Sequence, residues 1–311
     1  MMLDVLIALL PAVLMSLYVF GSATARIIAL SVVSCLATEA IFQRLRGRAI
    51  SIADGSAIVT GLILALSLPW TAPWYIPVIG GVVAIGIGKM VYGGLGYNIF
   101  NPAMVGRAFL MICFAQQFST WMMNGQGPWH AVIDATTGAT PLSLGKGIGG
   151  VTPAGSDWLW MFLGNINGSL GETSAVALLL GGLYLVIRRS AAWQIPAGVL
   201  IGAMVVAGIQ YAGHPGAPLT PVHHLFGGAL LFGAFFIATD PVSSPVSVPG
   251  RWVFGLGVGV LTMLIRLFSS YPEGVMFAVL LMNMLTPMIN RWTIPVPVGG
   301  KGPRPNGPKP A

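Results

Sequence analysis

The segment best suited to chemistry is DATTGATPL, residues 134–142. Thr140 offers a hydroxyl, and Gly138 and Ala139 place little steric bulk beside it. The same residue types also favour a simple turn, because Asp, Thr and Gly populate turns and Pro141 stops a helix. The residues alone favour a turn, with a chemical role of this segment as the alternative.

Ionisable residues in apolar surroundings are the next candidates. Asp54 opens one apolar run, Asp240 closes another, and Arg107 and Glu39 lie within two more. An ionisable side chain at membrane depth is often functional. Structural explanations compete: Asp54 and Asp240 could cap helices, and Arg107 could snorkel to an interface. We retain Asp54 and Asp240 as ion-path candidates and Arg107 as a cofactor-binding candidate.

Cysteine and histidine spacing predicts no metal site. Cys35 and Cys113 form no CxxC or Cys/His pattern, which argues against zinc or a self-contained iron–sulfur cluster. His223 and His224 are adjacent, so on a helix they would point about 100° apart. The net charge of +7 does not indicate nucleic-acid binding, because the basic residues are scattered at helix ends.

Composition places these candidates in a membrane protein. Of 311 residues, 55% are hydrophobic and 7% are charged, whereas soluble domains carry about 25% charged residues. Apolar runs long enough to cross a ~30 Å hydrocarbon layer recur along the chain, and the first is expected to be a retained span. We expect an all-α polytopic membrane protein, with residues 1–290 as one membrane domain. About ten helices are expected, over roughly 3–21, 26–43, 55–70, 74–93, 102–118, 172–188, 193–211, 222–239, 251–268 and 272–289.

The distribution of basic residues predicts the orientation. With a cytoplasmic N-terminus, eleven Lys and Arg residues lie near the cytoplasmic side and three near the outer side. The cytoplasmic set is Arg44, Arg46, Arg48, Lys89, Arg188, Arg189, Arg251, Arg291, Lys301, Arg304 and Lys309. The outer set is Arg26, Lys146 and Arg266. Residues 119–156 then form an outer, periplasmic loop, and residues 291–311 are expected to be a disordered cytoplasmic tail.

The two halves of the chain are weakly alike. An Asp-containing turn, a Gly-rich helix and a polar YNIFNP segment (97–102) have counterparts after Phe236. Five helices in each half would invert one half relative to the other in the membrane. Inverted repeats often place a binding site between the halves. The alternatives are a true inverted repeat and a chance likeness.

Segment 134–142 is similar to the flavinylation motif of the Rnf complex D subunit and of its relative, the B subunit of the sodium-pumping NADH:quinone reductase (the RnfD/NqrB family). Five residues match the motif in order: Asp134, Thr137, Gly138, Ala139 and Thr140. The resemblance covers most of the chain and ends in the C-terminal tail. It includes Asp54 with the run that follows, residues 97–107 and 158–172, and ATDPVS at 238–243.

The resemblance implies a function for Thr140. In that family a separate flavin transferase moves FMN from FAD onto the threonine hydroxyl, outside the cytoplasm, and makes a phosphoester. Thr140 would then be the tether of a redox relay and not a catalyst. The resemblance also implies a second flavin, riboflavin, which binds between the helices without a covalent bond. The location implied is the bacterial inner membrane.

The resemblance also implies partners. The Rnf complex couples electron transfer between ferredoxin and NAD to Na⁺ or H⁺ movement, and its other subunits are A, B, C, E and G. This chain has no nucleotide-binding fingerprint and no cluster-ligand cysteines, so it would depend on those partners. The nearest alternative is the quinone-reductase subunit, which usually has a longer N-terminal region. A flavin-free solute channel or transporter is the alternative from another class.

Overall fold

The computed structural model describes residues 1–47, 52–119, 162–163, 168–214, 219–269, 274–293 and 295. Within these ranges the regular elements are helices, and the only strand-like contact is an isolated β-bridge between Pro69 and Ser169. Apolar side chains such as Leu14, Ile112 and Phe268 remain more than half exposed on the outside. The chain is therefore a polytopic all-α membrane protein, as the composition predicts.

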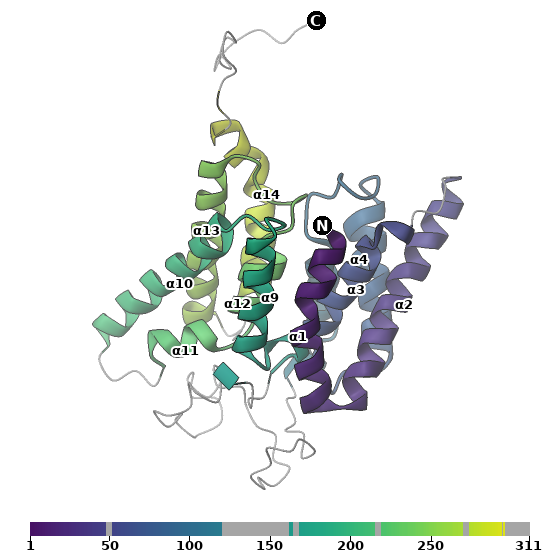
Figure 1. Ribbon diagram of the computed structural model, residues 1–311, viewed down its shortest axis with the longest axis horizontal. Helices are drawn as coiled ribbons and strands as arrows, with labels where there is room; N and C mark the ends of the chain where they lie inside the picture. Colours follow the sequence, from purple (N-terminus) through teal and green to yellow (C-terminus); the bar gives the residue numbers. More distant parts are fainter. Residues whose placement is uncertain are drawn as a thin grey trace, which may run out of the picture.

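The first group of helices comes from the N-terminal part of the chain (Figure 1). Its elements are α1 (Met2–Phe20), α2 (Ser22–Leu45), η1 (Ile52–Asp54), α3 (Ser56–Leu66), α4 (Tyr75–Ile85), η2 (Gly86–Met90), α5 (Pro102–Cys113) and α6 (Ala115–Ser119). Small residues let α2, α3 and α4 approach closely. A Cβ on Gly61 would lie 2.8 Å from Val32 Cα, and one on Gly81 would lie 2.8 Å from Ser34 Oγ.

The second group contains the remaining elements. They are η3 (Leu170–Glu172), α9 (Ala175–Ile187), α10 (Gln194–Gly213), α11 (Pro221–Phe226), α12 (Leu230–Phe232), η4 (Gly233–Ile237), α13 (Val248–Phe268) and α14 (Val275–Thr293). Helices α10 and α13 pack through glycines, because a Cβ on Gly255 or Gly259 would collide with carbonyl oxygens of α10. Such close approach is typical of membrane helix pairs.

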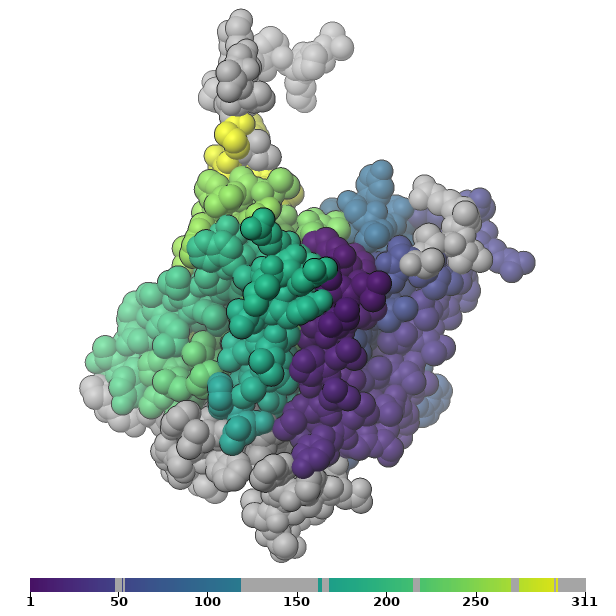
Figure 2. Space-filling model, in the orientation of Figure 1, coloured from purple at the N-terminus to yellow at the C-terminus, as the bar shows by residue number. Residues whose placement is uncertain are grey.

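The two groups meet along α1 and α9 and along α5 and α14. Figure 2 shows α1 and α9 side by side on one face of the molecule. A Cβ on Gly181 of α9 would overlap the carbonyl oxygen of Ala8, so the two backbones touch there. Each group also contains one π-helix, η2 in the first and η4 in the second.

In the part of the chain that the structure describes, five helices are long and apolar enough to cross a membrane by length and composition: α1, α2, α10, α13 and α14. Shorter apolar helices cover Ser56–Leu66, Tyr75–Met90, Pro102–Cys113 and Ala175–Ile187. The expected number of ten spans and the inverted repeat stay predictions.

The structure differs most from the sequence-based helices at 222–239. This segment is not one helix: it is divided into α11, α12 and η4 by a break at residues 227–229. Gly228 adopts φ +67°, a left-handed conformation that interrupts a helix and suits glycine. The helix expected over 55–70 ends at Leu66, before Pro69, and α14 continues through Thr293, beyond the expected start of the tail at 291.

Candidate functional site

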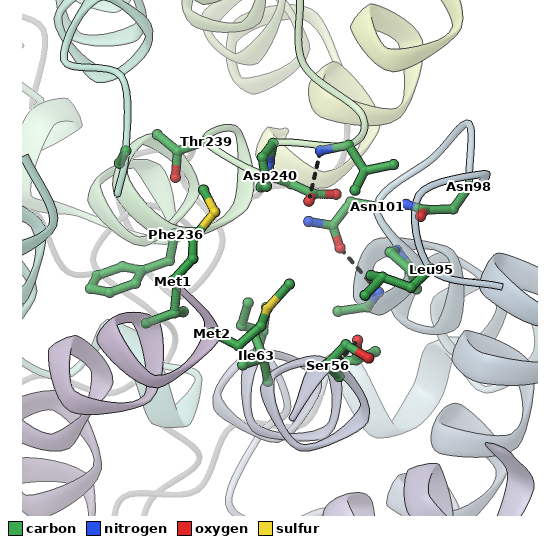
Figure 3. Close-up of a pocket in the computed structure, with 18 of the residues that line it drawn as sticks. Met1, Met2, Ser56, Ile63, Leu95, Asn98, Asn101, Phe236, Thr239 and Asp240 are labelled. Atoms are coloured by element: carbon green, nitrogen blue, oxygen red, sulfur yellow. Dashed lines mark hydrogen bonds between the residues drawn. The ribbon is translucent and has the colours of Figure 1, made fainter. Parts of the chain in front are cut away.

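The principal candidate site is a cavity between the two groups of helices, at the end of the molecule where Met1 lies (Figure 3). It encloses about 750 Å³ of space, including its open mouth. In Figure 3, Thr239 and Asp240 lie above the cavity and Ser56 and Ile63 lie below it. Its principal lining residues are Met1, Met2, Val5, Ser56, Val59, Thr60, Ile63, Lys89, Leu95, Asn98, Asn101, Ala103, Phe236, Thr239 and Asp240.

Both π-helices contribute to this cavity. Lys89 comes from η2 and Phe236 from η4. A π-helical turn inserts an extra residue into a helix and frequently occurs at functional sites, because it redirects side chains. The cavity therefore combines a mainly apolar wall with hydroxyl, amide and charged groups at a few points.

Lys89 forms a buried ion pair with Glu39 of α2. The Lys89 Nζ lies 2.7 Å from Glu39 Oε1 and 2.9 Å from Oε2, and both residues are 1% exposed. The ammonium also donates to Ser56 Oγ at 2.6 Å, so its three protons all have acceptors. Although the sequence predicts Lys89 near the cytoplasmic side, its charge is neutralised inside the protein and it is not a surface charge.

Asp54 connects to this ion pair through Ser56. One Asp54 carboxylate oxygen accepts from the backbone N–H of Ser56 at 2.9 Å and from its hydroxyl at 2.7 Å. These contacts stabilise the start of α3, as a capping carboxylate does. Asp54 does not line the cavity, whereas Ser56 does. A hydrogen-bonded line thus runs from Glu39 through Lys89 and Ser56 to Asp54.

Asp240 lines the cavity directly, in the turn between η4 and α13. Its carboxylate accepts from Ser243 Oγ at 2.9 Å and from Val242 N–H at 3.3 Å, and both of these donors are neutral. Burial raises the pKa of Asp240, and these two hydrogen bonds only partly oppose that rise. Asp240 would therefore hold a proton to a higher pH than an ordinary Asp side chain.

Arg107 of α5 lines a second, smaller cavity of about 290 Å³ and is 4% exposed. The other lining residues are Met104, Met111, Ala229, Ile237, Val275 and Met276. A snorkelling arginine would expose its head group to an interface. The burial of Arg107 favours the cavity-facing interpretation.

Arg266, which was expected at the outer side, is buried at 1% exposure, and the side on which it lies stays a prediction. Its guanidinium donates to the carbonyls of His224 at 2.7 Å and Gly227 at 2.9 Å. These carbonyls lie at the end of α11, where the helix break leaves them without helical donors. Arg266 therefore satisfies backbone carbonyls at the break in the eighth expected span, 222–239.

Comparison with known proteins adds the family. The model of the NQR2, RnfD, RnfE family matches residues 1–299. The chain belongs to this family. Among relatives, the D subunit of the proton-translocating ferredoxin:NAD(+) oxidoreductase complex of Clostridium ljungdahlii is 42% identical over 304 residues, which cover 95% of this chain and 90% of the relative.

Two further relatives show the same degree of similarity. The D subunit of the Na(+)-translocating ferredoxin:NAD(+) oxidoreductase complex of Acetobacterium woodii is 42% identical over 291 residues, covering 93% of this chain and 87% of the relative. The D subunit of the ion-translocating oxidoreductase complex of Stutzerimonas stutzeri is 42% identical over 314 residues, covering 93% and 89%.

In this member of the NQR2, RnfD, RnfE family, the structure describes only some of the predicted site residues. Its five motif residues lie outside the described residues: Asp134, Thr137, Gly138, Ala139 and Thr140. Of the other predicted site residues, Asp240 lines the larger cavity, Asp54 reaches it through Ser56, and Arg107 lines the smaller cavity.

Sequence reasoning missed Ser56, Asn101 and the pairing of Lys89 with Glu39. The two charged residues are separated by 50 positions and lie on different helices, so no local pattern connects them. Asn101 did carry a local signal, because Asn before Pro102 is a favourable helix start. Its contact with the second half of the chain could not be anticipated from that signal.

Proposed function

We propose that this chain is the D subunit of an Rnf-type complex, which couples electron transfer between ferredoxin and NAD to ion translocation. The relatives named above support the proposal, because they are D subunits of such complexes and match this chain over most of its length. The other subunits, A, B, C, E and G, would supply the ferredoxin, NAD and iron–sulfur chemistry. The relatives named for protons and for Na⁺ are equally similar, so the proposal covers both ions.

Inverted inner-membrane vesicles test this function. Vesicles from cells with the intact complex should form NADH from reduced ferredoxin and NAD and should take up Na⁺ or H⁺. Both activities should disappear when this subunit is deleted and should return with a plasmid copy. Quinone reduction without ferredoxin:NAD activity would assign the chain to the quinone reductase, and solute flux without any redox activity would assign it to a channel.

The proposed orientation has both chain ends in the cytoplasm and residues 119–156 in the periplasm of a bacterial inner membrane. Two sets of contacts support one part of this proposal, that the two chain ends share one side of the membrane and the loop lies on the other. Met1 and Asp240 line one cavity, and Ser247 Oγ is hydrogen-bonded to Thr293 Oγ1, so the start of α1 and the end of α14 lie at the same end of the molecule. The chain enters the 120–161 segment from α6, and Gln117 of α6 contacts Tyr75 at the start of α4, the opposite end of that helix from Lys89.

The proposed redox group is FMN, joined to Thr140 by a flavin transferase through a phosphoester. The five motif residues support this assignment. When bound, the flavin supplies a centre that accepts and donates electrons, and the covalent bond retains it without a requirement for binding affinity. Thr140 provides only the oxygen of the tether.

The larger cavity is the proposed site of the second, non-covalent flavin, riboflavin. Its walls suit a flat aromatic ring, because Val59, Ile63 and Phe236 are apolar. Polar groups at Asn98 and Asn101 could meet the edge of such a ring. A site of this kind, mainly apolar with a few polar groups, is typical of cofactor pockets.

Filling this cavity should remove the non-covalent flavin selectively. In Thr239→Phe the new ring would occupy cavity space, and the lost hydroxyl donates only to the Phe235 carbonyl of the preceding helix, η4. Acid extraction followed by chromatography should show loss of riboflavin, while flavin fluorescence of the denatured chain persists. The matched control is Thr71→Phe, at a partly buried threonine that does not line the cavity. Equal riboflavin content in both variants would contradict the assignment.

Asp240 is the proposed ion-path residue at the cavity, with Asp54 as the second candidate. Asp240→Asn keeps an oxygen that can accept from Ser243 but cannot ionise. We expect ion uptake per ferredoxin oxidised to fall to background in vesicles, with both flavins retained. Asp54→Asn should have the smaller effect, because Asp54 does not line the cavity. Unchanged uptake in Asp240→Asn would remove Asp240 from the path.

A further inference from the structure

Asn101 joins the two groups of helices at the larger cavity. Its Oδ1 accepts from the backbone N–H groups of Ala103 at 3.0 Å and Met104 at 3.4 Å, which caps the start of α5. Its Nδ2 donates to the carbonyl of Ile237 at 3.2 Å, across 136 residues of sequence. Ile237 is the last residue of the π-helix η4. One side chain, 4% exposed, therefore connects the start of α5 to the end of η4.

Asn283 of α14 extends this connection. In the amide orientation that satisfies both neighbours, Asn283 accepts from the Asn101 N–H at 3.1 Å and donates to the Ser243 carbonyl at 3.3 Å. Thr286 Oγ1 also donates to that carbonyl, at 3.0 Å. Asn283 is 1% exposed. We call Asn101 and Asn283 together the amide clamp.

The amide clamp is connected to both π-helices, directly to η4 and through the next residue, Pro102, to η2. On the η2 side, Gly88 packs against Pro102, the residue after Asn101; a Cβ on Gly88 would lie 2.9 Å from Pro102 Cα. On the η4 side, the Ile237 carbonyl accepts from Asn101. A buried donor or acceptor that loses its partner is costly, so these bonds hold η2 and η4 at a fixed separation.

The amide clamp also lies at the boundary between the two cavities. On α5, Ala103 lines the larger cavity and Met104 lines the smaller one. On η4, Phe236 lines the larger cavity and Ile237 lines the smaller one. Consecutive residues of two elements thus face different cavities, and the hydrogen bond from Asn101 to Ile237 joins these elements where the cavities meet.

We propose that the amide clamp is a positioning device that holds the two π-helices together and closes the larger cavity toward the smaller, Arg107-lined cavity. Opening the boundary requires the bonds of Asn101 to Ile237 and Asn283 to break. The closed state is stabilised by buried amide contacts between the two groups of helices. The clamp acts in this way whichever molecule occupies the larger cavity.

Cysteine labelling tests the closure in the purified complex. The reporter is Met104→Cys, at a fully buried residue of the smaller cavity, in a chain whose own Cys35 and Cys113 are replaced by Ala and Ser. The first clamp variant, Asn101→Ser, retains a side chain suited to capping α5 but cannot reach Ile237. The second, Asn283→Leu, removes both amide contacts of α14. Each should raise the rate of maleimide labelling by at least about tenfold, since Asn101→Ser loses one buried hydrogen bond and Asn283→Leu loses two.

Asn290→Ala is the matched control. Asn290 lies on α14, as Asn283 does, but its side chain accepts from the Val246 N–H at 3.1 Å and lines neither of the two cavities. Its labelling rate should equal that of the parent. Unchanged labelling in both clamp variants would overturn the proposal, as would an equal rise in Asn290→Ala. Failure of both clamp variants to assemble, judged by size exclusion, would also overturn it, because the amides would then belong to the folding core.

Discussion

Replacing Thr140 with Ala is expected to remove covalent flavin from the chain completely. The phosphoester needs the threonine oxygen to replace the leaving AMP on the FMN phosphorus, and Ala has no such oxygen. Wild-type chain made with the flavin transferase should fluoresce as a denatured band on a gel, and the variant band should be dark. Its intact mass should be lower by one FMN less one water, beyond the change from Thr to Ala.

Substitutions at Thr136 and Thr137, and a conservative substitution at Thr140 itself, make this test specific. Thr136 lies inside the motif segment but is not one of its five matching residues, so Thr136→Ala should retain full fluorescence, whereas Thr137→Ala should reduce it. Thr140→Ser keeps a hydroxyl and should retain part of the signal. Persistent fluorescence in Thr140→Ala would move the site to another residue. A dark wild-type band from cells that contain the transferase would refute the flavoprotein assignment itself.

The fold class was predictable because it depends on composition and on runs of apolar residues. A chain with so few charges cannot form a soluble surface, and each long apolar run can satisfy its backbone hydrogen bonds only as a helix in lipid. The all-α fold class is confirmed for the described residues, whereas the number of ten spans stays a prediction. The break at residues 227–229 was not predictable from hydropathy, because membrane helices tolerate glycine where neighbouring groups satisfy the backbone. Here Arg266 is that neighbour, 39 residues from Gly227.

In the candidate site, too, some features could be predicted from the sequence and others could not. Single residues with unusual local settings could be selected from the sequence: Asp240 stands beside Pro241 at the end of an apolar run, and Arg107 lies within one. Residues that act in pairs could not. Glu39 taken alone allows several interpretations, and Lys89 taken alone resembles an ordinary positive charge at a helix end. Only their spatial arrangement shows that each neutralises the other.

That arrangement leads to a second large effect: Lys89→Met should strongly destabilise the protein. The substitution leaves the Glu39 carboxylate 1% exposed beside the neutral Gln43 amide, which donates to it from 3.2 Å. Removing one partner of a buried ion pair typically costs about 3–5 kcal/mol, because the remaining charge is neither hydrated nor paired. We expect a marked loss of assembled complex in fluorescence-detected size exclusion after heating, at temperatures that leave the parent intact.

Two further variants separate charge from packing. The double variant Glu39→Leu/Lys89→Met removes both charges, and replacing a buried pair with apolar residues of similar size is often neutral or stabilising. It should regain most of the stability lost by Lys89→Met. Arg188→Met breaks an exposed pair, since the Arg188 side chain is 60% exposed and lies 3.5 Å from Asp4, and it should change stability little.

These variants also decide what the ion pair is for. If Lys89→Met is as stable as the double variant, the carboxylate is not held by Lys89 and the pair has no structural role. If the double variant is stable and still moves ions with electron transfer, the pair serves only to join α2, α3 and η2 beside the cavity. If it is stable and retains its flavins but no longer moves ions, the charges themselves are required. Lys89 and Ser56 would then connect Glu39 to the cavity as part of the coupling machinery, because these two members of the hydrogen-bonded line contribute to the cavity wall.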